Sequence, residues 1–96
     1  MNTNQPPLSP VVENLMYAAA LSVSQGKTDD AILLYDKVLA LMPDYANAYY
    51  ERGRARHLGG DVLGASEDLK RALQLSPELE KEITASKQIN YHKGCK

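Results

Sequence analysis

Apolar residues recur at helical spacing in successive segments of the chain, and turn-forming residues separate these segments. The first segment begins at Ser9-Pro10, because serine can accept backbone N–H bonds and proline suits the first helical position. It ends at Gln25-Gly26-Lys27, where glycine can adopt the left-handed conformation that closes a helix. Thr28 or Asp29 begins the second helix, and Met42-Pro43-Asp44 ends it, because the residue before a proline avoids helical geometry.

The next part of the chain repeats this plan. A third helix is predicted over residues 46–58 and ends at Gly59-Gly60, and Asp61 caps a fourth helix over residues 62–75. Ser76-Pro77 stops that helix and starts a fifth over residues 77–91, whose polar character suits a terminal cap. Since no segment alternates with a period of two for long enough to form a strand, the pattern predicts an all-α protein.

An internal repeat organises these helices. When the sequence is shifted by 34 residues it aligns with itself without a gap, so that residues 12–45 form one unit and residues 46–79 form the next. The turn and packing positions return in register. The matching pairs include Gly26 with Gly60, Ala31 with Ala65, Leu39 with Leu73, and Pro43 with Pro77.

The two units share a spacing of residues along both helices. The first unit reads Leu15-x2-Ala18-Ala19-x2-Ser22, Ala31-x3-Tyr35 and Pro43; the second reads Tyr49-x2-Arg52-Gly53-x2-Arg56, Ala65-x3-Leu69 and Pro77. This spacing resembles the 34-residue signature of the tetratricopeptide repeat (TPR) family, which is Trp-x2-Leu-Gly-x2-Tyr, then Ala-x3-Phe, then Pro. The resemblance implies a right-handed α-α superhelix of two helix-turn-helix repeats plus a C-terminal capping helix. It places a disordered arm at 1–9, one domain at 10–91, and a flexible tail at 92–96.

Small residues occupy the expected helix crossings, whereas two arginines depart from the signature. Ala19 and Gly53 allow close approach of the two helices in each unit. Arg52 and Arg56 stand where the signature has leucine and tyrosine, and their stems are expected to pack while their charged heads reach water. Ser22 also replaces a large aromatic residue, and these departures are expected to weaken the core within the units.

In this family the first helices of the repeats line a concave face that binds an extended peptide or a partner's helix. The resemblance carries this groove onto residues of both units and of the capping helix: Met16, Ala20, Asn47, Tyr50, Arg54, His57 and Lys81. Four of them lie three or four residues apart along the third helix, so they share one face. We expect an acidic group of the partner to lie near Arg54, His57 and Lys81, because arginine can hold a carboxylate with two bonds.

Some family members hold the C-terminal carboxylate of chaperones with a clamp of Lys and Asn residues. The corresponding positions in this sequence carry Met16, Ala20 and Glu51, and only Lys81 matches. A clamp of that kind is therefore not expected.

Charge and composition narrow the class of partner. The 11 basic and 12 acidic residues give a net charge of −1, which argues against a general grip on nucleic acid. Arg54 points away from Arg52 and Arg56 on a helix, so the three form no single basic patch. No apolar run is long enough to span a membrane, and the one cysteine, Cys95, favours the cytoplasm.

No arrangement of residues points to catalysis, a cofactor or a metal. Gly59, Gly60 and Gly64 lie at a turn between helices with no preceding strand, which is not a nucleotide-binding fingerprint. His92 and Cys95 are too few ligands for zinc. The sequence therefore predicts a non-catalytic module that binds another protein. The alternative is a self-associating subunit of a larger assembly, a homodimer in the simplest case, because repeat stacks generally need about three units for stability.

Overall fold

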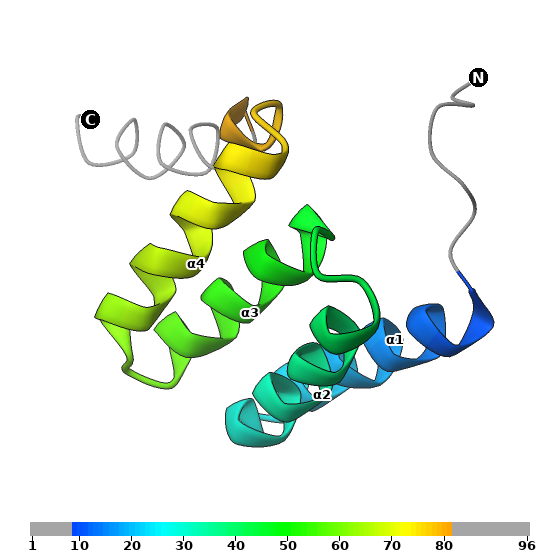
Figure 1. The fold of residues 1–96 in the computed structure, drawn as a ribbon. Helices are drawn as coiled ribbons and strands as arrows, with labels where there is room; N and C mark the ends of the chain where they lie inside the picture. Colours follow the sequence, from blue (N-terminus) through cyan, green and yellow to red (C-terminus); the bar gives the residue numbers. More distant parts are fainter. Residues whose placement is uncertain (1–8, 82–96) are drawn as a thin grey trace.

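The computed structural model describes residues 9–81, and these residues form four α-helices joined by short turns (Figure 1). The helices are α1 (Pro10–Ser24), α2 (Thr28–Leu41), α3 (Ala46–Leu58) and α4 (Val62–Leu75). The predicted all-α class, built from helical hairpins, is confirmed. The expected capping helix begins with a helical turn at residues 79–81, and its remainder, like most of the expected arm and all of the tail, lies outside the described residues.

Local sequence signals explain where the helices begin and end. The hydroxyl of Ser9 accepts the N–H of Val12 at 3.2 Å, and the carboxylate of Asp61 accepts the N–H of Gly64 at 2.9 Å. Gly26 and Gly60 have φ angles of 80° and 96°, in the left-handed region that other residues rarely adopt. The equivalent glycines of the two units therefore make equivalent turns.

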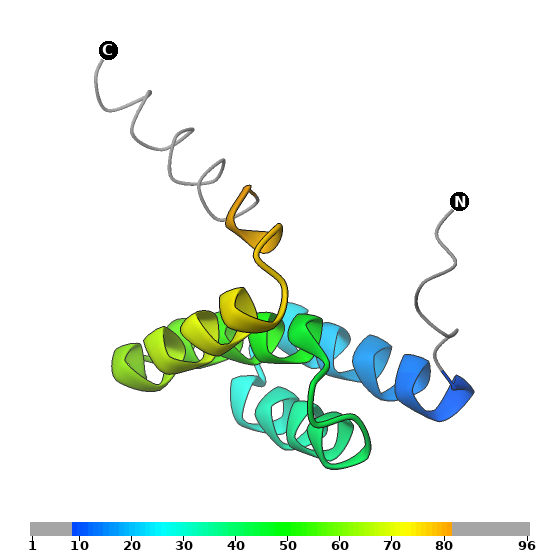
Figure 2. The same cartoon turned by 45° about the horizontal axis from the view of Figure 1, so that its top comes forward.

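The helices pack as two antiparallel hairpins that lie against each other (Figures 1 and 2). The first hairpin pairs α1 with α2, and the second pairs α3 with α4. Helix α3 joins the hairpins because it packs against α2 and also contacts α1, whereas α4 contacts only α3 among the described helices. The second hairpin thus leaves one side of α4 without a neighbouring described helix.

The apolar core lies in the first hairpin and at its contact with α3. One cluster centres on Val12, Val38, Leu39 and Ala48, and a second centres on Ala19, Ala31, Tyr35 and Ala55. Tyr35 and Val38 are the largest fully buried side chains of the described residues, and both come from α2. The first hairpin and α3 therefore supply most of the hydrophobic stabilisation.

The contact between α3 and α4 is closer and less apolar. Its buried residues are Gly53, Ala65, Asp68 and Ala72. A Cβ atom on Gly53 would lie 3.1 Å from the Cβ of Asp68 and 3.2 Å from the carbonyl oxygen of Ala65. Glycine allows the two backbones to approach closely here, as the repeat signature predicts.

Candidate functional site

A cavity of about 200 Å³ lies where the two hairpins meet. Helix α1 contributes Ala20, Val23 and Ser24, helix α3 contributes Glu51, Arg54, Ala55 and Leu58, and helix α2 contributes Tyr35. We call this feature the α1/α3 cavity. It exists because the ends of α1 and α3 lie close together while their facing residues, alanines above all, are small.

Tyr35 closes the α1/α3 cavity on its buried side. Its side chain is only 1% exposed, and it packs with Ala19, Ala31 and Ala55. Burial, reinforced by the nearby Glu51 carboxylate and opposed by the Arg54 guanidinium, raises the pKa of the Tyr35 hydroxyl to about 12. Tyr35 is therefore a neutral group at neutral pH.

Charged groups lie on the solvent side of the cavity. Arg54 donates to Glu51 at 3.3 Å, and its guanidinium lies 5.9 Å from the centre of the Tyr50 ring. The Arg54 side chain is 59% exposed and that of Glu51 is 34% exposed. Exposed ion pairs of this kind contribute little to stability, so the guanidinium is available to another anion at small cost.

The structure places the seven predicted groove residues in different surroundings. Ala20 and Arg54 meet at the α1/α3 cavity, and Tyr50 lies beside Arg54. Asn47 is exposed on α3, and Lys81 is exposed at the end of the described chain. Met16 is half-buried and packs against both apolar clusters. Tyr35, Glu51 and Ala55 also line the cavity and were not among the predicted residues.

His57 lines a different cavity, of about 300 Å³, on the side of α4. Its other walls come from α4 and are mainly apolar, with Ala65, Leu69 and Leu73 among them. The equivalent residues of the first unit, Ala31, Tyr35 and Leu39, are all buried. This surface on α4, which we call the α4 groove, is therefore the counterpart of the surface on α2 that packs against α3.

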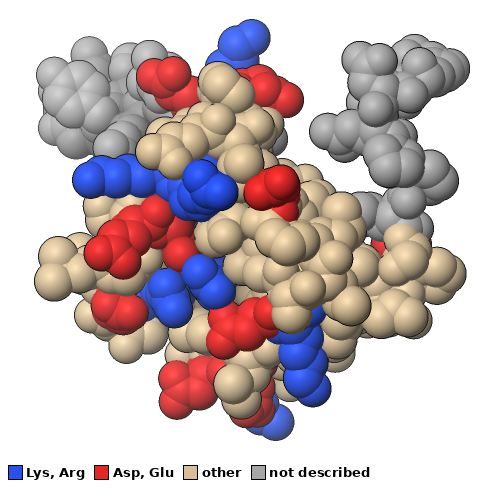
Figure 3. Space-filling view, in the orientation of Figure 1, with Lys and Arg blue, Asp and Glu red and all other residues tan. Residues whose placement is uncertain are grey.

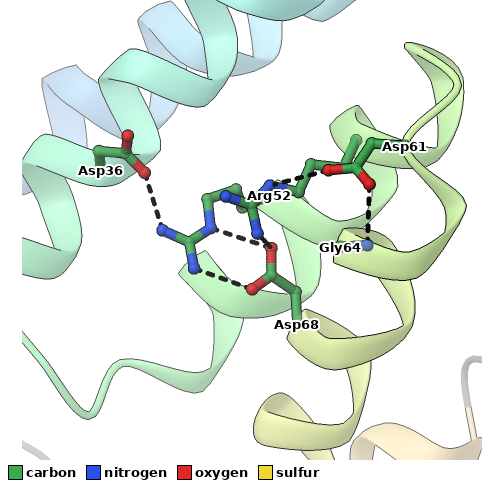
Figure 4. Close-up of polar contacts among 6 residues, drawn as sticks. Asp36, Arg52, Asp61, Gly64 and Asp68 are labelled. Carbon is green, nitrogen blue, oxygen red and sulfur yellow. Dashed lines mark hydrogen bonds and ion pairs between the residues drawn. The ribbon is translucent and has the colours of Figure 1, made fainter.

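A network of charged side chains holds α2, α3 and α4 together (Figure 4). Arg52 donates to both oxygens of Asp68, at 2.9 and 2.8 Å, and to Asp36 at 2.7 Å. Arg56 donates to Asp68 at 3.0 Å and lies 3.9 Å from Asp61, the residue that caps α4. Asp68 is buried and receives three hydrogen bonds from two arginines, so its charge is compensated inside the α3–α4 contact.

The expectation that the charged head of Arg52 reaches water is wrong. The Arg52 side chain is only 16% exposed, and its guanidinium is held by carboxylates on two other helices. Hydrogen bonding to Asp68 above all, and also to Asp36, raises the pKa of the Arg52 guanidinium despite its burial. These arginines are structural. Arg54 lies apart from them at the cavity, as predicted.

Other kinds of site find little support among the described residues. Acidic and basic side chains alternate on the face that Figure 3 shows, without a broad area of one sign. Within residues 9–81 no three His, Cys, Asp or Glu side chains are placed to hold a metal ion. In the same range, no helix is both long and apolar enough to cross a membrane.

Comparisons with known proteins agree with the repeat and the hairpins. The family model described as "TPR repeat" matches residues 21–60. The chain is 43% identical over 58 residues to Tetratricopeptide repeat protein 36 of Bos taurus, which is 60% of this chain and 31% of that protein. It is 41% identical over 56 residues to the Homo sapiens protein of the same name, covering 58% of this chain and 30% of that protein.

The Mus musculus protein of that name is 47% identical over 51 residues, 53% of this chain and 27% of the relative. The chain thus matches about a third, or less, of the length of these relatives. Repeats of this family generally mediate protein–protein interactions. The internal repeat, the two hairpins with equivalent glycine turns and these matches together identify tetratricopeptide repeats in this chain.

Proposed function

We propose that this chain is a non-catalytic adaptor or scaffold, and that a segment of a partner protein binds along the surface shared by α1 and α3. One observation carries the proposal: the α1/α3 cavity opens where the first helices of the two repeats meet. It combines apolar walls with an exposed cation, Arg54, which suits recognition of a polypeptide better than chemistry on a small molecule. We place the protein in the cytoplasm, because a chain with one cysteine forms no internal disulfide and suits a reducing compartment.

The proposed partner segment is a peptide or helix with an acidic group. Arg54 offers it a guanidinium, and Tyr50 beside Arg54 offers an aromatic ring with a polar end. His57 lies at the α4 groove and Lys81 at the end of the described chain, so the contact with the acidic group is assigned to Arg54. Aromatic and arginine side chains dominate the energetics of many protein interfaces, so Tyr50 and Arg54 are the residues to test first.

The test is a selection of short amide-capped peptides from a random library on the full chain, followed by titration of the selected peptides. Tyr50→Ala and Arg54→Ala are each expected to weaken binding about tenfold or more. Tyr17→Ala is the matched control, because Tyr17 is an exposed aromatic on α1 that does not line the cavity. Unchanged binding in both α3 variants would overturn the assignment of this surface.

A second candidate function, self-association within a larger assembly, is favoured by the outer side of α1. Leu21 occupies the repeat position of Ala55; Ala55 is fully buried against the first hairpin, whereas Leu21 is 45% exposed. Tyr17, four residues before Leu21, lies on the same side of α1 and is also exposed. Sedimentation over a range of concentrations tests this candidate. A concentration-dependent dimer that Tyr17→Ser abolishes supports it, and a strict monomer removes it.

A further inference from the structure

The size of the α1/α3 cavity limits what it can hold. Its volume of about 200 Å³ is below the range of about 300–1,000 Å³ typical of small-molecule and cofactor pockets. The walls nearest α1 are Ala20 and Val23, and Leu58 lies opposite on α3. A cavity of this size and lining suits one apolar side chain of a larger ligand.

The inner end of the cavity disfavours a charged group. Tyr35, which closes it, is buried and neutral, and its neighbours Ala19, Ala31 and Ala55 are apolar. A charged side-chain end placed beside these apolar groups would lose much of its hydration. Glu51, the acidic residue that lines the cavity, already accepts a hydrogen bond from Arg54. An aliphatic side chain therefore suits the interior better than lysine or arginine.

The mouth of the cavity has the opposite preference. Arg54 is more exposed than Glu51, so an approaching chain first meets the positive charge. The guanidinium has five N–H donors, and the Glu51 contact is a single bond of 3.3 Å. The Tyr50 ring lies against the guanidinium and limits its freedom. A carboxylate next to the aliphatic side chain can therefore bind Arg54 while Glu51 keeps its contact.

We propose that the α1/α3 cavity is an anchor pocket for one aliphatic side chain of the partner, and that a neighbouring Asp or Glu of the same segment binds Arg54. This inference rests on the proposed function and makes it specific: the recognised element is an apolar residue beside an acidic one within a chain. A terminal carboxylate is not part of the recognised element. The discriminating residue is Ala20, whose small side chain leaves the pocket open.

The test uses the amide-capped peptides selected on the full chain. It compares one variant in α1 with one variant in α2. Ala20→Leu fills the pocket from its wall, and Ala40→Leu makes the same change at an exposed position of α2 that does not line the cavity. Leucine is a good helix former, so both variants are expected to fold. Ala20→Leu is expected to weaken binding about tenfold or more, and Ala40→Leu is expected to leave it unchanged.

The acidic contact is tested with a double-mutant cycle. The selected peptides are expected to share Leu, Ile or Met next to Asp or Glu. Changing that acidic residue to its amide and changing Arg54→Gln should each weaken binding, and the two losses should not add. Equal binding by Ala20→Leu and wild type would overturn the anchor pocket, even if Tyr50→Ala still weakens binding and so supports the proposed function. A library that yields no binding peptide would overturn both.

Discussion

The two hairpins follow one 34-residue pattern, yet different interactions hold each pair of helices together. Three equivalent positions carry the difference: Ala18, Ser22 and Leu34 in the first hairpin, and Arg52, Arg56 and Asp68 in the second. In the first hairpin Leu34 packs against an apolar cluster. In the second, Asp68 is buried between the two arginines.

This difference shows how a repeat can accept charge in its core. Without the two arginines, an aspartate at position 68 would be left buried without a cation to compensate it, which is strongly unfavourable. With all three changed together, every charge is compensated, and Arg52 gains a further partner, Asp36, from the preceding hairpin. Apolar contact is non-directional, whereas a two-bond arginine–carboxylate pair fixes geometry. The network therefore defines how α3, α4 and α2 are oriented.

The largest effect is expected when the network is broken from its centre. Asp68→Asn removes the charge that compensates Arg52 and Arg56 while nearly preserving the shape of the side chain. The free energy of unfolding should fall by about 3 kcal/mol, because both guanidinium groups lose the buried anion that they share and keep only the more exposed Asp36 and the more distant Asp61. Urea denaturation followed by circular dichroism measures the change.

Asp44→Asn is the matched control for that measurement. Asp44 is exposed and lies 3.9 Å from Arg71, so its loss should change the free energy of unfolding by less than about 0.5 kcal/mol. If Asp68→Asn were as mild as this control, the network would not be a determinant of stability.

A smaller change in stability is expected when the first hairpin's residues replace their equivalents in the second hairpin. The triple variant Arg52→Ala, Arg56→Ser, Asp68→Leu removes every charge of the buried group at once and leaves Asp36 half-exposed. Replacing a buried ion network by apolar residues is often neutral or stabilising by about 1–4 kcal/mol. The triple variant should therefore be at least as stable as wild type in urea. A loss equal to that of Asp68→Asn would show that the second hairpin cannot accept the first hairpin's packing.

The features that the sequence predicted well are local ones. The third and fourth helices were placed at residues 46–58 and 62–75, as observed, because Asp61 and Gly60 act within one turn of a helix end. The repeat also identified Gly53 as a crossing point, since a missing side chain has one simple packing consequence. Signals of this kind need no knowledge of distant partners.

The charged network and the cavity depend on residues far apart in sequence. Arg52 lies 16 positions from both Asp36 and Asp68, and nothing local to Arg52 reveals either partner. A comparison of the units at all three positions would have given a signal, because Leu34 is replaced by Asp68 where two arginines also appear. The predicted groove residues lie at two different cavities for a related reason. The exposed face of α3 is wide, so its Arg54 edge faces α1 while its His57 edge faces α4.

The helix crossings offer an intermediate comparison, with Ala19 in the first hairpin and Gly53 in the second. Gly53→Ala would gain about 1 kcal/mol of helix propensity. The new Cβ would, however, crowd the Asp68 Cβ, the Ala65 carbonyl oxygen and the Leu69 side chain at 3.1–3.3 Å, so a net loss of about 1–2 kcal/mol is expected. Ala19→Gly should lower the free energy of unfolding by about 1 kcal/mol. It removes a buried methyl group, and glycine gives the unfolded chain more conformational entropy to lose on folding. Thermal melts of both variants test these two expectations. A stabilised Gly53→Ala would show that α3 and α4 can move apart enough to accept a methyl group at no cost in stability.

The smallest expected effect concerns Tyr35 and appears only at alkaline pH, since the equivalent residue of the second unit, Leu69, cannot ionise. Burial raises the pKa of Tyr35 from 10.0 to about 12, so the folded state keeps a proton that the unfolded chain releases. The stabilisation is complete below pH 10 and is lost as the pH rises toward 12, at about 1 kcal/mol per pH unit. Tyr35→Phe removes this loss, so its stability relative to wild type should rise between pH 10 and 12. Tyr17→Phe, at an exposed site, is the control for both the substitution and the general effect of alkali. Parallel pH curves for wild type and Tyr35→Phe would mean that the Tyr35 hydroxyl is not held in the neutral form by its burial beneath the α1/α3 cavity.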